Sequence, residues 1–246
     1  MYDTSDITRT LKSFLTNLQV LLDKEPLPPK LCINPLIMRL PGVGYLHALN
    51  VTWYGKRTKD LDNWITKLAA LAPTIGPPPQ ETIKQTNTVE AMVGVTSTLP
   101  HGCHGHFQSI SLKRWSPQVI DTYVKHVESM VDGTGILFHE LRACSPSAGT
   151  PDQFPGSIFN QRQPHILIEI LPMGNSPEDA VPRNKWAAAC RDGLAQTDAA
   201  LKWNYPSLMA PEHSSPEKFW GETATELKQL KKELDPTGVF KSFPSF

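Results

Sequence analysis

The residues best suited to acid–base chemistry lie on a stretch that alternates between apolar and polar side chains. Across residues 164–171, isoleucines at every second position alternate with His165, Leu167 and Glu169. Successive side chains of a strand point to opposite faces, so we expect the isoleucines to face the core and Glu169 to face a pocket. A carboxylate beside an imidazole can hold and move a proton, which makes Glu169 with His165 a candidate catalytic pair. The alternative is a salt-bridged or solvated sheet face.

A second stretch, residues 135–142, offers another candidate catalytic pair. Alternation places Phe138, Glu140 and Arg142 on one face of this predicted strand. A guanidinium stabilises the charged form of a nearby carboxylate, so Glu140 and Arg142 can work together in acid–base chemistry. Phe138 then contributes to the apolar wall of the same pocket. The alternative for the charged pair is again a salt bridge on a solvated face.

Other side chains in or beside predicted loops are suited to binding an apolar ligand. Aromatic and polar groups come together at Arg114, which precedes a tryptophan, and at Trp203 and Tyr205. Such groups supply an apolar wall with a hydrogen-bonding handle. We assign Arg162 to an anionic or carbonyl group of the ligand and His106 to the pocket wall. The alternatives are core packing for the aromatic residues and a loop-to-backbone hydrogen bond for Arg162.

Three histidines and a cysteine crowd residues 101–106, and such a set can bind zinc or copper. Metal sites usually draw their ligands from separate elements, so we favour the alternative of a Gly-rich loop that leads into a strand. We therefore predict no metal. The sequence also lacks the glycine-rich nucleotide-binding motifs, the G-x-S-x-G nucleophile motif and the H-E-x-x-H zinc motif.

Apolar periodicity predicts the elements that must position these residues. We predict strands at 31–40, 45–54, 80–87, 105–112, 135–142 and 164–171, and helices at 5–23, 59–71, 88–95, 116–130, 185–201 and 215–234. Ser5 or Asp3 is expected to cap the first helix. Strands and helices do not alternate as in regular βαβ units. The pattern therefore favours an α+β fold, an antiparallel β-sheet with helices packed on one face and a pocket on the other, as a single domain of residues 1–246.

The charge composition argues against two classes of partner. Lys and Arg together number 24, and so do Asp and Glu, which gives a formal net charge of zero. Binding to nucleic acid or to an anionic membrane surface needs a basic surplus, so we expect neither. No apolar run approaches the roughly 18 residues of a membrane span, and no secretory signal is visible. The four cysteines lie far apart, as in a reduced protein, so we predict a cytoplasmic location; the alternative is a secreted form with one disulfide.

The C-terminal residues carry the most specific pattern. Trp220-Gly221-Glu222-Thr223 leads into a helix, and residues 230–240 read Leu-Lys-x-x-x-Asp-Pro-x-x-x-Phe. Because proline cannot continue a helix, the Asp-Pro pair ends it. This segment resembles the C-terminal segment of berberine-bridge-enzyme-like, FAD-linked oxidoreductases, in which an aromatic-Gly-x-Asn tetrad precedes the same ending. The order of the upstream elements is similar to that of the family's substrate-binding domain.

The resemblance covers nearly the whole chain but only the second half of a typical family member, and nothing here corresponds to the family's FAD-binding domain. The asparagine of the tetrad, which in the family helps to hold the flavin, is Thr223 here, and Trp220 replaces a tyrosine. A flavin held by one domain alone would leave its ring half in water. We therefore expect this chain to hold no cofactor by itself.

Relatives in that family include cyclases, so the resemblance implies a cofactor-independent cyclase of natural-product biosynthesis, of the pericyclase or (hetero-)Diels–Alderase type. It would bind a hydrophobic small molecule on the open sheet face and hold it in a reactive geometry. Two alternatives stay open: a subunit or fragment of an FAD-linked oxidoreductase that needs a separate flavin domain, and a non-catalytic ligand-binding module. The face that meets the flavin domain in the family should be apolar, which also predicts a homodimer.

Overall fold

The computed structural model describes the chain except for residues 97–101, 141–163, 203–204, 206–207, 209–214 and 242–246. Within the described residues, five strands form one sheet in the order β2-β1-β4-β5-β3, and all neighbouring strands are antiparallel. The predicted α+β class with an antiparallel sheet is thus confirmed. The strands are β1 (Leu31–Leu40), β2 (Gly44–Trp53), β3 (Gln108–Leu112), β4 (Thr134–Glu140) and β5 (Ile166–Pro172).

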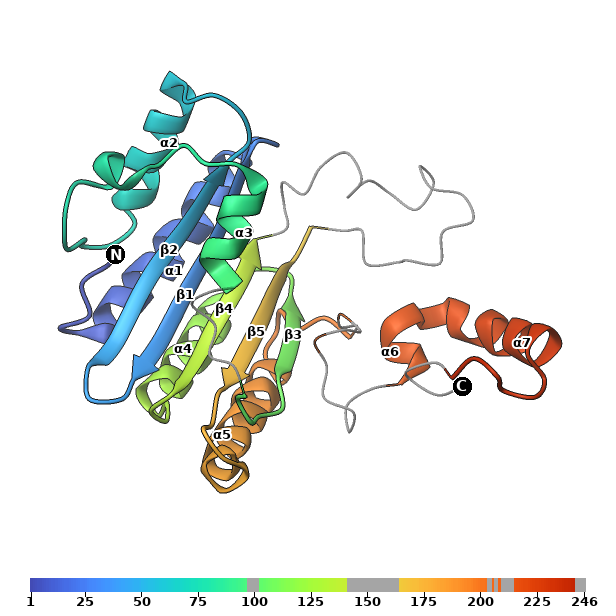
Figure 1. Cartoon of the computed structure of the whole chain (residues 1–246). Coiled ribbons are helices and arrows are strands. Elements are labelled where there is room, and N and C mark those ends of the chain that lie inside the picture. The colour runs from blue at the N-terminus through green and yellow to red at the C-terminus, as the bar shows by residue number, and fades with distance from the viewer. Residues whose placement is uncertain (97–101, 141–163, 203–204, 206–207, 209–214, 242–246) are drawn as a thin grey trace.

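Three long helices cover one face of this sheet, as expected. The helices α1 (Ile7–Lys24), α4 (Pro117–Glu128) and α5 (Pro177–Ala195) lie behind the strands in Figure 1. The helix α2 (Lys59–Ala69) follows the β1–β2 hairpin and sends Trp64 and Leu68 into the same core. Each helix turns one apolar stripe inward because its apolar residues recur every three or four positions. The opposite face of the sheet carries the candidate site residues, which are described in the next subsection.

Helix caps show where the sequence prediction was right and where it was wrong. The Ser116 hydroxyl accepts a hydrogen bond from the Val119 N–H at 3.2 Å and caps α4, as the Ser-Pro pair predicts. The cap of α1 is Asp6, which accepts from the Arg9 N–H at 3.0 Å, rather than Ser5 or Asp3. The Asp3 carboxylate is already occupied, since it accepts from the Ser5 N–H at 2.9 Å.

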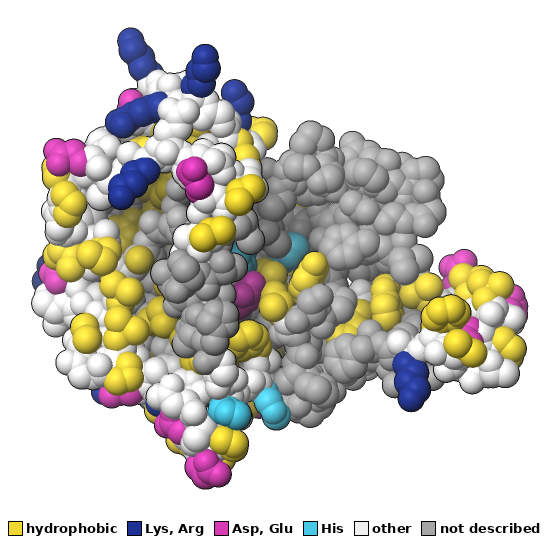
Figure 2. All heavy atoms as spheres, viewed as in Figure 1, with side chains coloured by type: hydrophobic (Ala, Val, Ile, Leu, Met, Phe, Trp, Pro, Cys, Tyr) yellow, Lys and Arg dark blue, Asp and Glu magenta, His cyan; other side chains and the backbone are white. Residues whose placement is uncertain are grey.

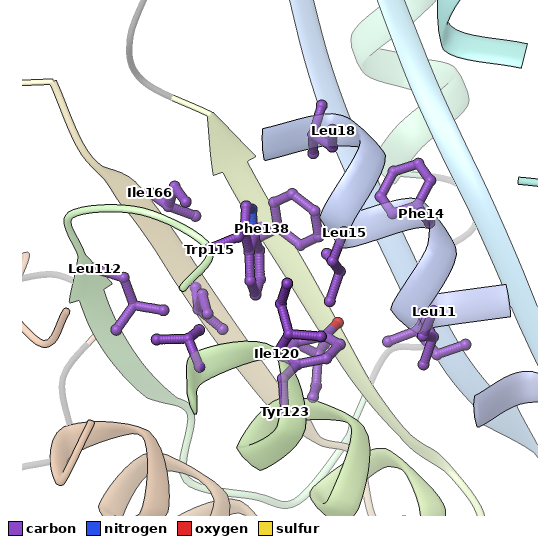
Figure 3. Close-up of a cluster of buried hydrophobic side chains, with 14 of the residues drawn as sticks. Leu11, Phe14, Leu15, Leu18, Leu112, Trp115, Ile120, Tyr123, Phe138 and Ile166 are labelled. Atoms are coloured by element: carbon purple, nitrogen blue, oxygen red, sulfur yellow. The ribbon is translucent and has the colours of Figure 1, made fainter. Parts of the chain in front are cut away.

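The centre of the core is a cluster of aromatic rings between the sheet and the helices (Figure 3). The Trp115 ring meets Phe138 edge-on, with 4.8 Å between ring centroids, and Tyr123 edge-on at 5.3 Å. Phe14 of α1 lies 6.5 Å from Phe138 on the other side. Phe138 is only 2% exposed. The prediction that Phe138 lines a ligand pocket is therefore wrong, because its side of β4 faces the helices.

Two predicted elements have different bounds or types in the structure. Residues 80–87 contain no strand; the short 3-10 helix η1 (Pro79–Thr82) begins there, since adjacent prolines remove backbone donors. The helix α5 starts well before the predicted residue 185, capped by Ser176, and it contains Pro182. A short helix, α3 (Thr88–Thr96), occurs where one was predicted and is drawn in front of the sheet in Figure 1.

The predicted last helix is divided in two. A left-handed backbone at Gly221, with φ of 56°, ends α6 (Pro216–Trp220). A 3-10 turn, η6 (Gly221–Thr223), then leads into α7 (Ala224–Leu234). Only glycine adopts this backbone region without steric cost, so the position of Gly221 in the sequence fixes the break.

We expect the protein to lose stability in acid because the His47 ring is buried. Its ring is 1% exposed, packs 4.8 Å from both the Tyr2 and Phe14 rings, and its Nδ1 has no hydrogen-bond partner. Burial, followed by the nearby N-terminal ammonium, lowers the pKa of His47 from 6.5 to about 3. The stabilising contribution of the neutral ring is complete above pH 6.5 and is lost as pH falls toward 3. We expect a slope of up to about 1.4 kcal/mol per pH unit in that window.

Urea unfolding between pH 7 and pH 4 measures this slope, with pH values chosen to span the interval over which the unfolded His47 becomes charged. The variant His47→Leu should unfold with a shallower pH dependence than the wild type. His106→Gln, at an exposed position, is the matched control and should keep the wild-type slope. Equal slopes for His47→Leu and the wild type would contradict the assignment.

Candidate functional site

The strand register determines which side chains occupy the face of the sheet away from the helices, here called the open face. Directly opposite residues in an antiparallel pair share a face. Glu169 of β5 is opposite Leu137 of β4 and Ser109 of β3. Its neighbours on β5, Ile168 and Ile170, are completely buried on the helix side. The predicted orientation of Glu169, away from the isoleucine core, follows from the same alternation.

Three polar side chains from three strands form a hydrogen-bonded row on the open face. Asn34 of β1 lies with its Nδ2 atom 2.5 Å from Nδ1 of His139 on β4. The other ring nitrogen of His139, Nε2, lies 2.8 Å from Oε1 of Glu169 on β5. The side chains of His139 and Glu169 keep 27% and 18% exposure, so a ligand can reach them. We call this set the Asn34–His139–Glu169 row.

The orientation of the Asn34 amide assigns the proton positions of the row. With its nitrogen toward His139, the amide donates and the facing Nδ1 accepts. The ring proton is therefore on Nε2, which donates to the Glu169 carboxylate. A carboxylate has more lone pairs than this one hydrogen bond uses, so Glu169 can still accept a proton or a hydrogen bond from a ligand. The arrangement is that of a positioned general base.

Apolar side chains surround this row. Leu36 of β1 is opposite Leu137 of β4, and Leu167 and Leu171 flank Glu169 on the same face of β5. Figure 2 shows hydrophobic side chains gathered over the β1–β2 part of the sheet face turned to the viewer. The open face thus combines an apolar floor with one polar row, which suits a hydrophobic ligand that carries a few polar groups.

The structure corrects the predicted partner of Glu169. His165 is buried and lies just before β5, four residues ahead of Glu169 and about 13 Å away at the rise of an extended chain, so the two do not form a pair. His139 takes that place. Sequence reasoning put His139 on the face opposite to Glu140 but could not connect it to Glu169, because the pairing of β4 with β5 is a long-range property. Asn34 was missed for the same reason.

Among the described residues, the other predicted site residues Arg114, His106 and Tyr205 do not gather at this row. Arg114 forms an ion pair with Asp23 of α1 at 2.9 Å, on the helix-covered side, so its assignment to the pocket is wrong. His106 is exposed, and its backbone N–H donates to Asn184 of α5 at 2.8 Å. Tyr205 is also exposed. Arg142, Arg162 and Trp203 lie outside the described residues, as does the side chain of Glu140, the last residue of β4.

The histidine-rich segment is held by backbone contacts in its described part. His104 pairs through its backbone with Gly174, and the backbone of His106 is held by α5. Across the described part of the chain, no three His, Cys, Asp or Glu side chains come together as a metal site requires. His101 lies outside the described residues.

The C-terminal pattern has a clear structural basis. The Asp235 carboxylate accepts hydrogen bonds from the backbone N–H groups of Val239 and Phe240, at 2.8 and 3.0 Å. Lys231, one turn earlier, pairs with that carboxylate and donates to the Phe240 carbonyl. Thr223, at the position of the flavin-holding asparagine, donates its hydroxyl to the Trp220 carbonyl at 2.7 Å. At this position, the chain therefore directs its one side-chain donor to its own backbone, which leaves only acceptor lone pairs for another partner.

Among the described helices, none has the length and hydrophobicity needed to cross a membrane.

We predict that Asn34 sets the protonation of His139. In Asn34→Asp, a carboxylate that only accepts replaces the donor, so Nδ1 of His139 must also carry a proton and the ring becomes charged. The ¹⁵N chemical shifts of His139 should show one protonated nitrogen, Nε2, in the wild type and two in the variant. Asn34→Leu, which neither donates nor accepts, is the matched control and should leave the ring neutral. A wild-type ring protonated only on Nδ1 would refute the assignment.

Comparison with known proteins places this fold. No protein-family model matches the sequence. The sequence is similar to the FAD-linked oxidoreductase aurO of Gibberella zeae, with 25% identity over 231 residues, a match that covers 92% of this chain and 43% of that protein. The chain thus spans less than half the length of this curated relative.

Solved structures show the same relation. A variant of Physcomitrella patens BBE-like 1 matches with a TM-score of 0.70 and 15% identity, over 100% of this chain and 52% of that one. Berberine bridge enzyme from Eschscholzia californica matches with a TM-score of 0.66 and 12% identity, over 97% and 52%. For 6-hydroxy-D-nicotine oxidase from Arthrobacter nicotinovorans the TM-score is 0.69 at 12% identity, over 98% and 51%. In sequence and in fold, the chain therefore resembles about half of a berberine-bridge-enzyme-like, FAD-linked oxidoreductase.

Proposed function

We propose that the chain is the substrate-binding half of an FAD-linked oxidoreductase, which binds a hydrophobic small molecule on the open face and removes a proton from it with Glu169. The observation that carries this proposal is the Asn34–His139–Glu169 row on an apolar floor. The similarity to the FAD-linked oxidoreductase aurO supports the redox class. This similarity also agrees with the alternative that the chain is a fragment of an FAD-linked oxidoreductase.

The residues of the row have separate tasks in this proposal. The Glu169 carboxylate takes a proton from a hydroxyl or an activated C–H of the ligand. His139 holds the carboxylate in place through its Nε2–H, and Asn34 holds the ring in the required tautomer. The apolar surroundings limit competing water, which strengthens the electrostatic effect of the base. In enzymes of this class, FAD is the electron acceptor. Since Thr223 offers no free donor to a flavin, we place any flavin on a separate flavin-binding domain.

A second candidate is the cofactor-independent cyclase, and the Thr223 contact favours it. A chain that directs this hydroxyl to its own backbone has lost one of the family's flavin contacts. The same base could then start a dehydration or an isomerisation, after which the ligand cyclises in the geometry that the open face imposes. No electron carrier is needed for that reaction.

A spectroscopic probe tests the shared base. Umbelliferone is a fused-ring phenol whose phenolate absorbs at longer wavelength than its phenol, so its spectrum reports the charge beside the bound probe. At a pH where free umbelliferone is about half phenolate, binding beside the Glu169 carboxylate should shift the probe toward the phenol, because two adjacent negative charges repel. A bound probe with the same phenolate fraction in the wild type and in Glu169→Gln would refute contact of the ligand with Glu169.

A flavin titration then separates the two candidates. We expect the purified chain alone to bind no FAD, which equilibrium dialysis with absorbance detection measures directly. Under the oxidoreductase proposal, oxidation of a substrate requires added flavin-binding protein. Turnover of a precursor by the chain alone, without flavin, would decide for the cyclase.

A further inference from the structure

A cysteine side chain on β1 reaches the Asn34–His139–Glu169 row. Cys32 is a free, half-buried cysteine two residues before Asn34, so the two side chains lie on the same face of the strand. The Sγ atom of Cys32 lies 3.5 Å from the Oδ1 atom of Asn34 and donates a hydrogen bond to it. The open face therefore carries a fourth polar group, which is connected to the row through Asn34.

The hydrogen bonds of these four residues all run in one direction. The Cys32 thiol donates to Oδ1 of Asn34, and Nδ2 of Asn34 donates to Nδ1 of His139. Nε2 of His139 then donates to the Glu169 carboxylate. Each end of the amide has the partner that it needs, because its oxygen only accepts and its nitrogen only donates. Aligned hydrogen bonds polarise and strengthen one another, so the bond from the thiol supports the two that follow it.

The surroundings of Cys32 keep the thiol in the form that can donate. Burial is the largest influence on this group and raises its pKa, so the thiol retains its proton at neutral pH. The Asn34 side chain, which could turn its N–H groups toward a thiolate, is the smaller influence and lowers the pKa. A thiolate would thus reverse the amide and leave its oxygen facing His139. The protonated thiol and the observed orientation of the Asn34 amide therefore belong together.

We propose that Cys32 is a positioning residue for the base. Its thiol holds the Asn34 amide with the nitrogen toward His139, and this keeps the ring proton on Nε2, beside Glu169. Without a donor at position 32, the amide is held at one end only and can turn. Once it turns, its oxygen faces Nδ1 of His139, and the ring must place a proton there. This inference rests on the proposed function, because Glu169 is the base that His139 supports.

Two variants separate hydrogen bonding from packing at this position. A free cysteine can also serve as a small apolar filler. Cys32→Val fills the space but has no donor, whereas Cys32→Ser is smaller and keeps a donor. If Cys32 acts through its hydrogen bond, the first variant should lose the effect and the second should retain it. Cys103→Val, at an exposed position, is the matched control for the loss of a thiol.

Nitrogen NMR of the full chain measures the orientation of the amide and the protonation of the ring. In the wild type, a ¹⁵N–¹⁵N coupling across the hydrogen bond should connect Nδ2 of Asn34 with Nδ1 of His139. In Cys32→Val this coupling should weaken. The ratio of rings with a proton-free Nδ1 to all other ring forms should fall about two- to fivefold, the effect of losing one weak neutral hydrogen bond. Cys32→Ser and Cys103→Val should keep the wild-type coupling and ratio.

Three results would overturn the inference: a wild type without the coupling, an unchanged ratio in Cys32→Val, or an equal fall in Cys32→Val and Cys32→Ser. The proposed function has a separate readout, the umbelliferone spectrum of Glu169→Gln. If that spectrum differs from the wild type but the coupling survives in Cys32→Val, only the inference fails. If the two spectra are identical, the proposed function fails, and the support of a base by Cys32 fails with it.

Discussion

Glu169→Gln should abolish most of the activity of the open face while leaving the fold intact. The amide has the same shape, and its oxygen can still accept from the His139 Nε2–H, so the row keeps its geometry. What is lost is the basic group. Positioned general bases typically contribute 10²–10⁴-fold in rate, so we expect a loss of about that size in kcat, with little change in KM.

The measurement combines turnover with the bound-phenol spectrum. The phenolate-to-phenol ratio of bound umbelliferone should rise by about tenfold in Glu169→Gln, because the neutral amide removes the negative charge that disfavours the phenolate. Glu226→Gln is the matched control, since Glu226 is an exposed residue of α7 far along the chain from the row. A Glu169→Gln protein that keeps both the turnover and the phenolate-to-phenol ratio of the wild type would rule out Glu169 as the base.

Phe138→Ala should destabilise the protein by about 3–5 kcal/mol, a large part of the total stability of a domain. The ring is buried between Trp115 and Phe14, where removing it leaves a cavity that rigid aromatic neighbours cannot fill. Chemical unfolding of the variant measures this loss as a lower denaturant midpoint.

The same substitution tests whether Phe138 belongs to the core or to the ligand site. If Phe138 lined the ligand site, Phe138→Ala would weaken ligand binding and leave stability nearly unchanged. As a core residue, it should lower stability while the folded fraction retains its affinity for umbelliferone. Phe107→Ala is the matched control, because Phe107 is 49% exposed and its loss should change stability by no more than about 0.5 kcal/mol.

Local sequence patterns were sufficient for the elements and for one side chain of the site. The strict alternation of isoleucines in β5 fixes the face of Glu169 without knowledge of any partner. The same rule fails in β4, where Leu137 and Phe138 are both apolar and lie on opposite faces. Which of them is buried depends on Phe14 and Trp115, residues from elements distant in the sequence.

The partner of Glu169 could not be predicted for a related reason. His139 and Glu169 meet because β4 and β5 pair in one particular register, and a shift by one residue would turn one of the two side chains to the other face. The sequence contains no short turn between these strands that would set that register. The contribution of Asn34 requires a second long-range pairing, that of β1 with β4.

The strand order also determines when the site can exist during synthesis and folding. The β1–β2 hairpin is local, but β1 must pair with β4 across the segment that contains α2, α3, β3 and α4. β3, the strand at the far edge of the sheet, can pair only after β5 has formed. An emerging chain therefore completes its first hairpin early, whereas the base and its imidazole support assemble only once the last strand has left the ribosome.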